Sequence, residues 1–302
     1  MTTQQSFISE LKKQLETAVP STLCMLLYRI PWLISLVFVG SIGSKELAAA
    51  ALATTLCNIT GMSLSVGLST AITTLTGQAR GELIARGKEK KEVSSSLNNE
   101  ITPLIQNTSQ NDDTSPLLPM VYLYRGIFIQ LAFVLPVGCY WIYGIKPLLL
   151  LLGQREDIST MTEQYLRLLT PGLWGYSINW TLTSWLQVIE LAHIPAYAAL
   201  FGDLLHIPMN LFFIHVMKWG YLGVGVATSI FQVVQPVVMF VYLKGTKYGR
   251  ATLLDHVGAK NIGRASLSFW CEAKMAISSM AGVLQYLKLA LPGILAISKK
   301  KI

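Results

Sequence analysis

The sequence predicts an all-α membrane protein that crosses the bilayer several times. Of its 302 residues, 52% are hydrophobic and only 13% are charged, and the mean hydropathy is +0.48. Soluble domains carry about 25% charged residues, so half of the usual charge is missing. A large soluble helical protein with buried helices is the alternative, but it would not need so many apolar windows.

Several windows reach the roughly 20 apolar residues that a transmembrane helix needs. Six are strong and one is weaker. The strong windows are Val19–Ile42, Leu47–Leu75, Met120–Ile142, Tyr165–Val188, Ile194–Val216 and Tyr221–Leu243, and the weaker one is Met280–Ser298. We therefore predict a six-helix transmembrane bundle followed by a partial seventh helix.

The distribution of basic residues predicts the orientation. With a cytosolic N-terminus and six spans, fourteen Lys and Arg residues fall on the cytosolic side. Five fall on the outer side: Lys45, Lys146, Arg155, Arg167 and Lys218. Cytosolic loops carry an excess of Lys and Arg, so we expect the N-terminus in the cytosol. The net charge of +8 then reflects topology, and we expect no nucleic-acid partner.

These windows divide the chain into four parts. We expect a cytosolic N-terminal segment over residues 1–17, a transmembrane lobe over residues 18–243, a cytosolic loop over residues 244–279, and a partial seventh helix with a lysine tail over residues 280–302. Within the lobe, the polar residues 81–119 lack the apolar content to fold, which predicts a disordered cytosolic loop. Residues around "GQREDISTMTEQYLRLL" have the pattern of an amphipathic helix at the outer interface.

The apolar windows contain helix-breaking and small residues. Prolines such as Pro31, Pro171 and Pro208 can bend a span, which membrane proteins tolerate where the freed backbone groups line a cavity. The second window is rich in Ala, Gly and Ser, which allow close helix packing. These features favour a transporter or channel over a simple anchor.

Several stretches closely resemble eukaryotic multidrug and toxic compound extrusion (MATE) transporters. The clearest is "LISLVFVGSIGSKELAAAALATTLCNITGMSLSVGLSTAITTLTGQARG", and "PLLLLLGQREDIS", "YLRLLTPGLWGYSIN", "LQVIELAHIPAYAALFGDLLHIPMN" and "GYLGVGVATSI" follow in the same order. "YLKLALPGILAIS" is similar to the start of the family's seventh helix. The resemblance implies twelve helices in two lobes, with a cleft between them that opens alternately to each side. This chain would supply the first lobe and the start of helix seven.

The resemblance also identifies where coupling groups stand in the family. The acid positions of helices one and five in prokaryotic relatives correspond to Ser35 and Ile214, which cannot titrate, whereas an amide position is kept as Asn210. The helix-seven glutamate of eukaryotic members would fall within Lys299–Lys301. We therefore expect a shortened form of a longer transporter.

Ionisable and aromatic residues inside the spans are the candidate pathway residues. Asp203 and His206 lie three residues apart on one helix face, and Arg29 of the first span could reach them. Trp180 could bind an organic cation by cation–π contact. A structural hydrogen-bonded cluster, and packing or interfacial roles for tryptophan, are the alternatives.

Two short patterns in the polar loop resemble acidic-dileucine sorting signals. One combines Glu100 with Leu104 and Ile105, and the other combines Asp113 with Leu117 and Leu118. They would direct a protein to endosomal or vacuolar membranes, and chance occurrence is the alternative. The plasma membrane is the other location that we expect.

The predicted function is MATE-type antiport. The chain would export organic cations, xenobiotics or secondary metabolites in exchange for H⁺ or Na⁺, with the lipid bilayer, a small-molecule substrate and possibly a second copy or another lobe as partners. The alternative is a non-transporting fragment that associates with full-length transporters. We expect no enzyme activity, cofactor or metal, because the four histidines lack metal-ligand spacing. The four cysteines form no CxxC pair and fit buried packing.

Overall fold

A computed structural model describes residues 2–97, 118–257 and 269–301, and every regular element in these ranges is helical. The N-terminal half contains α1 (Thr2–Leu27), α2 (Ile30–Ile42), α3 (Ser44–Leu56), the π-helical turn η1 (Cys57–Met62), α4 (Ser63–Leu97), α5 (Leu118–Tyr143) and α6 (Ile145–Leu151). The C-terminal half contains α7 (Glu156–Val188), α8 (His193–Leu211), η3 (Phe212–Val216), α9 (Tyr221–Phe240), η4 (Val241–Gly245), α10 (Lys247–His256), α11 (Phe269–Ser278) and α12 (Met280–Lys301).

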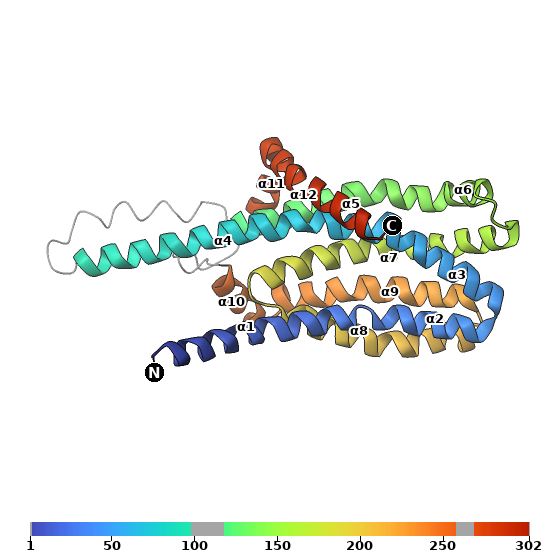
Figure 1. The fold of residues 1–302 in the computed structure, drawn as a ribbon, viewed down its shortest axis with the longest axis horizontal. Coiled ribbons are helices and arrows are strands. Elements are labelled where there is room, and N and C mark those ends of the chain that lie inside the picture. Colours follow the sequence, from blue (N-terminus) through green and yellow to red (C-terminus); the bar gives the residue numbers. More distant parts are fainter. Residues whose placement is uncertain (1, 98–117, 258–268, 302) are drawn as a thin grey trace.

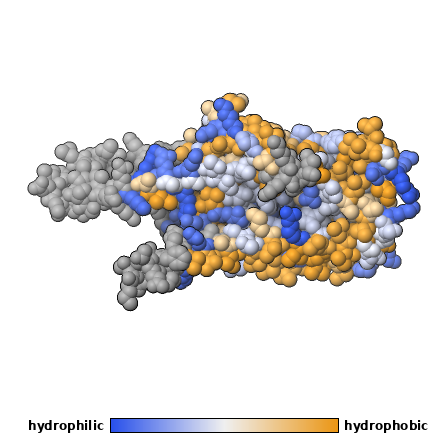
Figure 2. All heavy atoms as spheres, in the orientation of Figure 1, coloured by the Kyte–Doolittle hydropathy of each residue, from blue (hydrophilic) through white to orange (hydrophobic). Residues whose placement is uncertain are grey.

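The long helices lie side by side in an elongated bundle (Figure 1). The N-terminus, the free end of α4 and α10 lie at one end, and α6 and the turn between α2 and α3 lie at the other. A hydrophobic surface covers much of the bundle between the two ends, which are more hydrophilic (Figure 2). This arrangement is the one expected of helices that cross a bilayer.

Five helical segments in the described ranges are long and apolar enough to cross a membrane. They are Gln14–Ile42, Ser44–Lys88, Leu118–Tyr143, His193–Val216 and Tyr221–Gly245. A sixth is possible if α11 and α12 form one bent span, with 77° between Glu272–Ser278 and Met280–Ala296. The predicted span Tyr165–Val188 is helical, but it does not belong to this apolar set.

Helix α7 explains that difference, because it lies inside the bundle and packs against α3, α4, α5 and α9. Its buried side chains include many polar ones, among them Ser177, Asn179, Thr181 and Thr183. These residues lower its hydropathy while neighbouring helices shield them from lipid. The helix is also continuous from Glu156. The prediction of a separate interfacial helix is therefore wrong, and the residues assigned to it form the first turns of α7.

Small residues set the closest helix contacts. A Cβ atom added to Gly175 of α7 would lie 2.7 Å from the Gln232 carbonyl oxygen and 2.8 Å from Val233 Cα of α9. A Cβ on Gly67 of α4 would lie 2.6 Å from the Ile294 Cα of α12. Backbones that approach this closely gain packing contacts, which is how helices associate in lipid.

A break divides the first span at Tyr28 and Arg29, as its proline predicts. Pro31 lies in the first turn of α2, has no N–H to donate and sterically opposes a helix that continues through the preceding turn. Residues 1–17, predicted as a cytosolic segment, are helical from Thr2 and extend α1. The first span is therefore two helices that meet inside the bundle.

The described parts of two predicted loops contain helices, and residues 98–117 and 258–268 of these loops lie outside the described residues. Within residues 81–119, α4 continues to Leu97, because its Glu, Lys, Leu and Ala residues are good helix formers and Arg86 pairs with Glu82 one turn away at 2.5 Å. Within residues 244–279, the structure contains α10 and α11. Composition alone pointed to disorder in the first case, but intrinsic helix propensity prevails up to Leu97.

Arginines fix these additional helices to the bundle. Arg80 of α4 donates from Nε to the His256 carbonyl oxygen and from Nη1 to the Val188 carbonyl oxygen, each at 3.1 Å. Arg125 of α5 is buried and donates from Nε to the Ala276 carbonyl oxygen of α11 at 3.2 Å. Both arginines bind carbonyl groups at helix C-termini, where cations are favoured.

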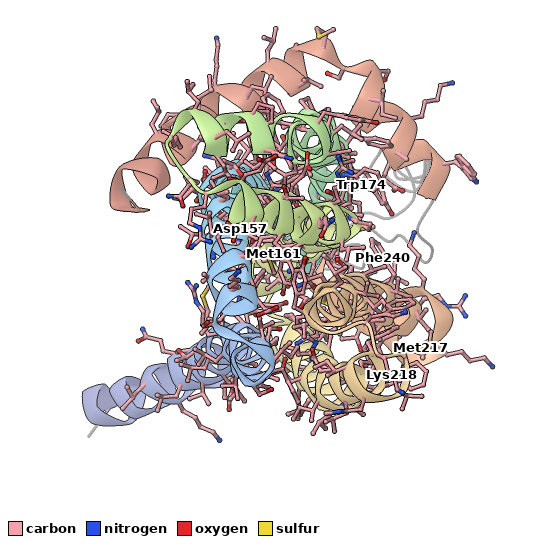
Figure 3. All side chains as sticks on the ribbon, turned by 90° about the vertical axis from the view of Figure 1, so that its right-hand side faces the viewer. Asp157, Met161, Trp174, Met217, Lys218 and Phe240 are labelled. Carbon is pink, nitrogen blue, oxygen red and sulfur yellow. The ribbon has the colours of Figure 1, made fainter. Side chains whose placement is uncertain are left out.

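The opposite end of the bundle carries ion pairs that join α3, α6 and α7. Lys45 lies 3.6 Å from Asp157, and Lys146 lies 3.6 Å from Glu156. Figure 3 looks onto this end and shows Asp157 and Lys218 on opposite sides of it. Because these charges are partly or fully exposed, they mark an aqueous boundary and contribute little stability.

Candidate substrate and ion pathway

A polar cluster lies on one face of α8 and on the adjoining parts of α2 and α9, and we use the name α8 pocket for this group of side chains. It consists of Ser35, Asp203, His206, Asn210 and Thr228, all of which are buried. Ser35 Oγ lies 3.0 Å from His206 Nε2 and 3.1 Å from Thr228 Oγ1. The Phe231 ring lies beside the imidazole, with 5.1 Å between the ring centroids. The pocket therefore joins three helices that are far apart in the sequence.

Asp203 is the acidic member of the α8 pocket. Its side chain is 6% exposed, and neither carboxylate oxygen has a hydrogen-bond partner among the described residues. It lies within electrostatic range of the Cys24 thiol of α1. A buried polar group without a partner is costly, and a carboxyl group inside a membrane span is a candidate for ion handling.

The other members of the α8 pocket also have unused hydrogen-bonding capacity. Asn210 donates from Nδ2 to the His206 carbonyl oxygen at 2.8 Å, but its Oδ1 has no partner in the described structure. His206 Nδ1 is likewise without one. Asp203, His206 and Asn210 therefore present four unpaired polar atoms that a proton carrier, a water molecule or a cation could satisfy.

A second polar network lies beside the pocket and was missed by the sequence analysis. Asn179 donates from Nδ2 to the Tyr28 hydroxyl at 3.0 Å and to Gln235 Oε1 at 2.9 Å. The Tyr28 hydroxyl also lies 2.9 Å from Thr183 Oγ1. The available signal was an amide residue within each of two apolar windows, since buried amides need partners.

Arg29 does not join Asp203 and His206, so that prediction is wrong. It lies in the break between α1 and α2, where its side chain is exposed. Within the described ranges it forms no ion pair, and its charge lies within electrostatic range of the Tyr176 hydroxyl of α7. The helix breaks after Leu27, so the Arg29 side chain does not follow the face of α1 that packs against α8.

Trp180 lies in an aromatic group that we call the Trp180 wall, formed by Tyr28, Tyr176 and Trp180. The Trp180 ring stacks on Tyr176 with 5.8 Å between centroids and 21° between planes. Its distance to the Tyr28 ring is 6.0 Å. All three side chains are partly exposed, so the wall borders the bundle surface rather than its core.

The remaining predicted positions do not contribute to the pocket. Ile214 lies in η3 and packs against an apolar cluster that includes Val224. Of the sorting patterns, only Leu118 is described, as the first residue of α5. The other members lie outside the described residues: Glu100, Leu104, Ile105, Asp113 and Leu117.

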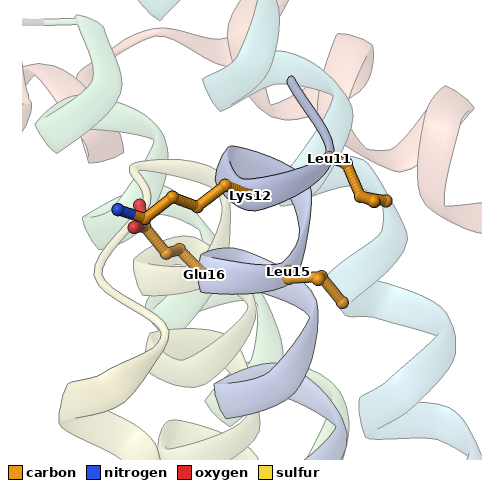
Figure 4. Close-up of a pocket in the computed structure, with 4 residues that line it drawn as sticks. All are labelled: Leu11, Lys12, Leu15 and Glu16. Carbon is orange, nitrogen blue, oxygen red and sulfur yellow. The ribbon is translucent and has the colours of Figure 1, made fainter. Parts of the chain in front are cut away.

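A surface depression occurs at the N-terminal part of α1. Leu11, Lys12, Leu15 and Glu16 line it, and Figure 4 shows Lys12 and Glu16 side by side. All four residues come from one exposed helix, so the depression is separate from the α8 pocket and is not the candidate site. Among the described residues, no group of three or more His, Cys, Asp or Glu side chains is arranged to hold a metal ion.

The fold and the site together define a multi-pass membrane protein whose helical bundle has a polar interior. The family model described as MatE matches residues 20–88 and 115–212. The chain therefore belongs to the MatE family.

Curated relatives support this assignment. The chain is 28% identical over 225 residues to Protein DETOXIFICATION 12 of Arabidopsis thaliana, covering 74% of this chain and 40% of the relative. It is 26% identical over 234 residues to Multidrug and toxin extrusion protein 1 of Xenopus tropicalis, covering 78% and 35%. The chain thus spans less than half the length of these relatives.

Solved structures show the same fold. The crystal structure of the eukaryotic MATE transporter AtDTX14 matches with a TM-score of 0.71 and 20% identity, covering 98% of this chain and 55% of that one. An outward-facing multidrug resistance MATE family transporter matches with a TM-score of 0.66 and 17% identity, covering 94% and 52%. The observed bundle is therefore similar to about half of a MATE transporter.

Proposed function

We propose that this chain forms one half of a secondary antiporter that exports small organic molecules in exchange for an inward flow of H⁺ or Na⁺. The observation that carries the proposal is the buried, unpartnered carboxyl group of Asp203, one turn from His206 in an apolar span. Organic cations, xenobiotics and secondary metabolites are the candidate substrates. Family membership supports transport as the activity class.

Asp203 would be the coupling group, in place of the acid positions that this chain lacks. A proton or cation bound at Asp203 would satisfy its unpaired carboxylate oxygens, and its release would leave the carboxylate unsatisfied again. Asp203 lies one turn from His206 on α8, and His206 is hydrogen-bonded to Ser35 of α2 and packs its ring against Phe231 of α9. A shift of α8 that accompanies binding at Asp203 would therefore change the contacts of α8 with both neighbouring helices. Coupling requires that the proton or cation bind Asp203 with a different affinity in each of two arrangements of these helices.

We also propose that the N-terminus is cytosolic, based on the excess of basic residues at the end that holds α10 and the free end of α4. The chain would act together with a second lobe, supplied by a second copy or another polypeptide. A plasma-membrane or vacuolar location fits the proposal equally well.

Transport by the purified chain in proteoliposomes tests the proposal. Tetraethylammonium and 2-naphthoate serve as a cationic and an anionic probe, and a pH or Na⁺ gradient provides the driving force. We expect gradient-driven flux of at least one probe, loss of that flux in Asp203→Asn, and retention of probe exchange without a gradient. Asp157→Asn, which alters an exposed acid at the end of the bundle, is the matched control and should retain the flux.

The competing function, a non-transporting partner of full-length transporters, makes the opposite prediction. It predicts no flux of either probe under any gradient, together with crosslinking to a full-length relative in the same membrane. Gradient-driven flux that Asp203→Asn leaves unchanged would overturn the coupling role.

A further inference from the structure

Arg29 occupies an unusual place for an exposed charge. It lies close to the midpoint of the candidate span Gln14–Ile42, yet its side chain is exposed on the surface of the bundle. An arginine at the centre of a bilayer is costly when it faces lipid, so such residues face a water-filled cavity or a partner. Exposed apolar side chains of Leu26 and Leu33 flank Arg29, so it is the guanidinium group itself that needs water or an anionic partner at this depth.

A polar strip borders the hydrophobic surface of α1 and α2 (Figure 2). In Figure 2, paler and hydrophilic side chains occupy a strip between the hydrophobic surface of α1 and α2 and that of the upper helices. The α7 helix runs through this part of the bundle (Figure 1). Partly exposed Tyr176 and Trp180 of α7 lie near Arg29, because the Tyr28 ring lies 6.0 Å from the Trp180 ring and the Arg29 charge lies within electrostatic range of the Tyr176 hydroxyl.

The chemistry of this surface selects one kind of ligand. The Trp180 wall presents aromatic rings at which a planar ring can stack, with 5.8 Å between the stacked centroids of Tyr176 and Trp180. The Arg29 charge lies within electrostatic range of the Tyr176 hydroxyl of the wall, and a guanidinium group can bind a carboxylate or sulfonate through two parallel hydrogen bonds. The same positive charge repels an organic cation, which the aromatic rings alone would attract.

We propose that Arg29 and the Trp180 wall form a binding site for a planar aromatic anion. The acidic group of the ligand pairs with the Arg29 guanidinium, and its ring stacks on Trp180. The inference rests on the proposed transport function and narrows its substrate class from organic molecules in general to aromatic acids. It assigns Arg29 a role independent of Asp203, with which it makes no contact.

Three ligands that share one ring system and differ in charge test the site. They are 2-naphthoate, 2-naphthamide and 2-naphthylmethylammonium. Binding to the full chain in nanodiscs is measured by equilibrium dialysis, and empty nanodiscs correct for lipid partitioning. We expect 2-naphthoate to bind at least about tenfold more tightly than the other two, as a charge-assisted hydrogen bond to arginine provides.

Variants separate the contribution of the charge from that of the rings. Arg29→Gln should weaken 2-naphthoate binding at least about tenfold and leave 2-naphthamide unchanged, whereas Arg29→Lys should retain part of the preference for the anion. Trp180→Leu should weaken all three ligands. Trp174→Leu, which alters an exposed tryptophan of the same helix, is the matched control and should weaken none.

Two results would overturn the proposal. One is tighter binding of 2-naphthylmethylammonium than of 2-naphthoate to the unaltered chain. The other is unchanged 2-naphthoate binding in Arg29→Gln, which would mean that Arg29 does not contact the ligand. Because dialysis needs no gradient, anion binding without flux would contradict only the proposed transport, and flux of tetraethylammonium without anion binding would contradict only this site.

Discussion

Two polar regions of the bundle contain similar side chains but differ in how well these are satisfied. In the first, which we call the α7 seam, Ser65 Oγ lies 2.7 Å from Ser177 Oγ and Gln130 donates from Nε2 to the Ser65 carbonyl oxygen at 2.7 Å. Of the side-chain polar atoms of these three residues, only Gln130 Oε1 lacks a partner in the described structure. In the α8 pocket, four polar atoms of Asp203, His206 and Asn210 lack partners in the described structure. The α7 seam joins helices through its hydrogen bonds, whereas the α8 pocket has unpaired polar atoms that can bind a proton carrier, a water molecule or a cation.

This difference helps to distinguish polar side chains that stabilise helix packing inside a membrane from polar side chains that are available to bind an ion or substrate. Small hydroxyl side chains in the seam stand where α4, α5 and α7 pack closely, and they gain partners from the neighbouring helix. The pocket contains an ionisable carboxyl and an imidazole, whose burial without full satisfaction costs free energy. Such a cost persists in a protein when the site serves a function.

The largest expected effect comes from a substitution that forces α7 and α9 apart at their tightest described contact. Gly175→Ala places a methyl group 2.7 Å from the Gln232 carbonyl oxygen, and because the neighbour is backbone the helices must separate. We expect a loss of about 3 kcal/mol or more in stability, measured as early unfolding in fluorescence-detected size-exclusion chromatography after heating.

Gly81→Ala is the control for this substitution, since it makes the same change in α4 where no atom lies within 4 Å of the added Cβ. It should leave the unfolding temperature unchanged or raise it slightly, because alanine favours the helix. Equal unfolding temperatures for the two variants would mean that α7 and α9 do not pack as closely as described.

The second prediction contrasts the seam and the pocket directly. Ser177→Ala removes one partner of a paired hydroxyl and should lower the unfolding free energy by about 1 kcal/mol. Asp203→Leu replaces an unpartnered carboxyl group by an apolar side chain and should raise it by about 1 kcal/mol or more. The changes in unfolding temperature should therefore have opposite signs.

If both variants are less stable than the unaltered chain, Asp203 has partners that stabilise the fold, and the distinction between seam and pocket fails. A functional measurement sharpens the result. Ser177→Ala should keep gradient-driven flux in proteoliposomes, whereas Asp203→Leu should lose it while gaining stability.

The smallest effect concerns a fully paired acid outside the spans. The Ile158 backbone N–H donates to Asp157 Oδ1 at 2.9 Å, and with Arg155 it lowers the pKa of the Asp157 carboxyl below its usual value. A carboxyl whose pKa is lower in the folded state stabilises the fold above its unfolded pKa and loses this contribution as the pH falls. Asp157→Asn should therefore be slightly less stable at neutral pH, and the difference should vanish in acid.

Unfolding temperatures of the two proteins between pH 7 and about pH 3 provide the measurement. Because the side chain is exposed, added salt should also reduce the difference. A difference that grows as the pH falls would contradict the assigned pairing of Asp157.

The sequence predicted the helical bundle well, since long apolar windows leave few alternatives to a span. It failed in residues 81–97, where charged residues suggested disorder although their helix propensity is high. It also placed Arg29 with Asp203, because periodicity describes one continuous helix and cannot anticipate the direction of a side chain after a break. The bond between Ser35 and His206 joins residues 171 positions apart, and no local pattern encodes such a contact.

The length of α4 has a practical consequence for imaging. The span Ser44–Lys88 begins in α3, so α4 starts partway through the ~30 Å of hydrocarbon, whereas its 35 residues at a rise of about 1.5 Å per residue measure roughly 50 Å. Its outer turns therefore stand in water as a rigid extension of a helix that is anchored in the bundle by α5, α7 and α12. A soluble domain fused in helical register to this extension would provide a fixed landmark for aligning particles of a small membrane protein in cryo-electron microscopy.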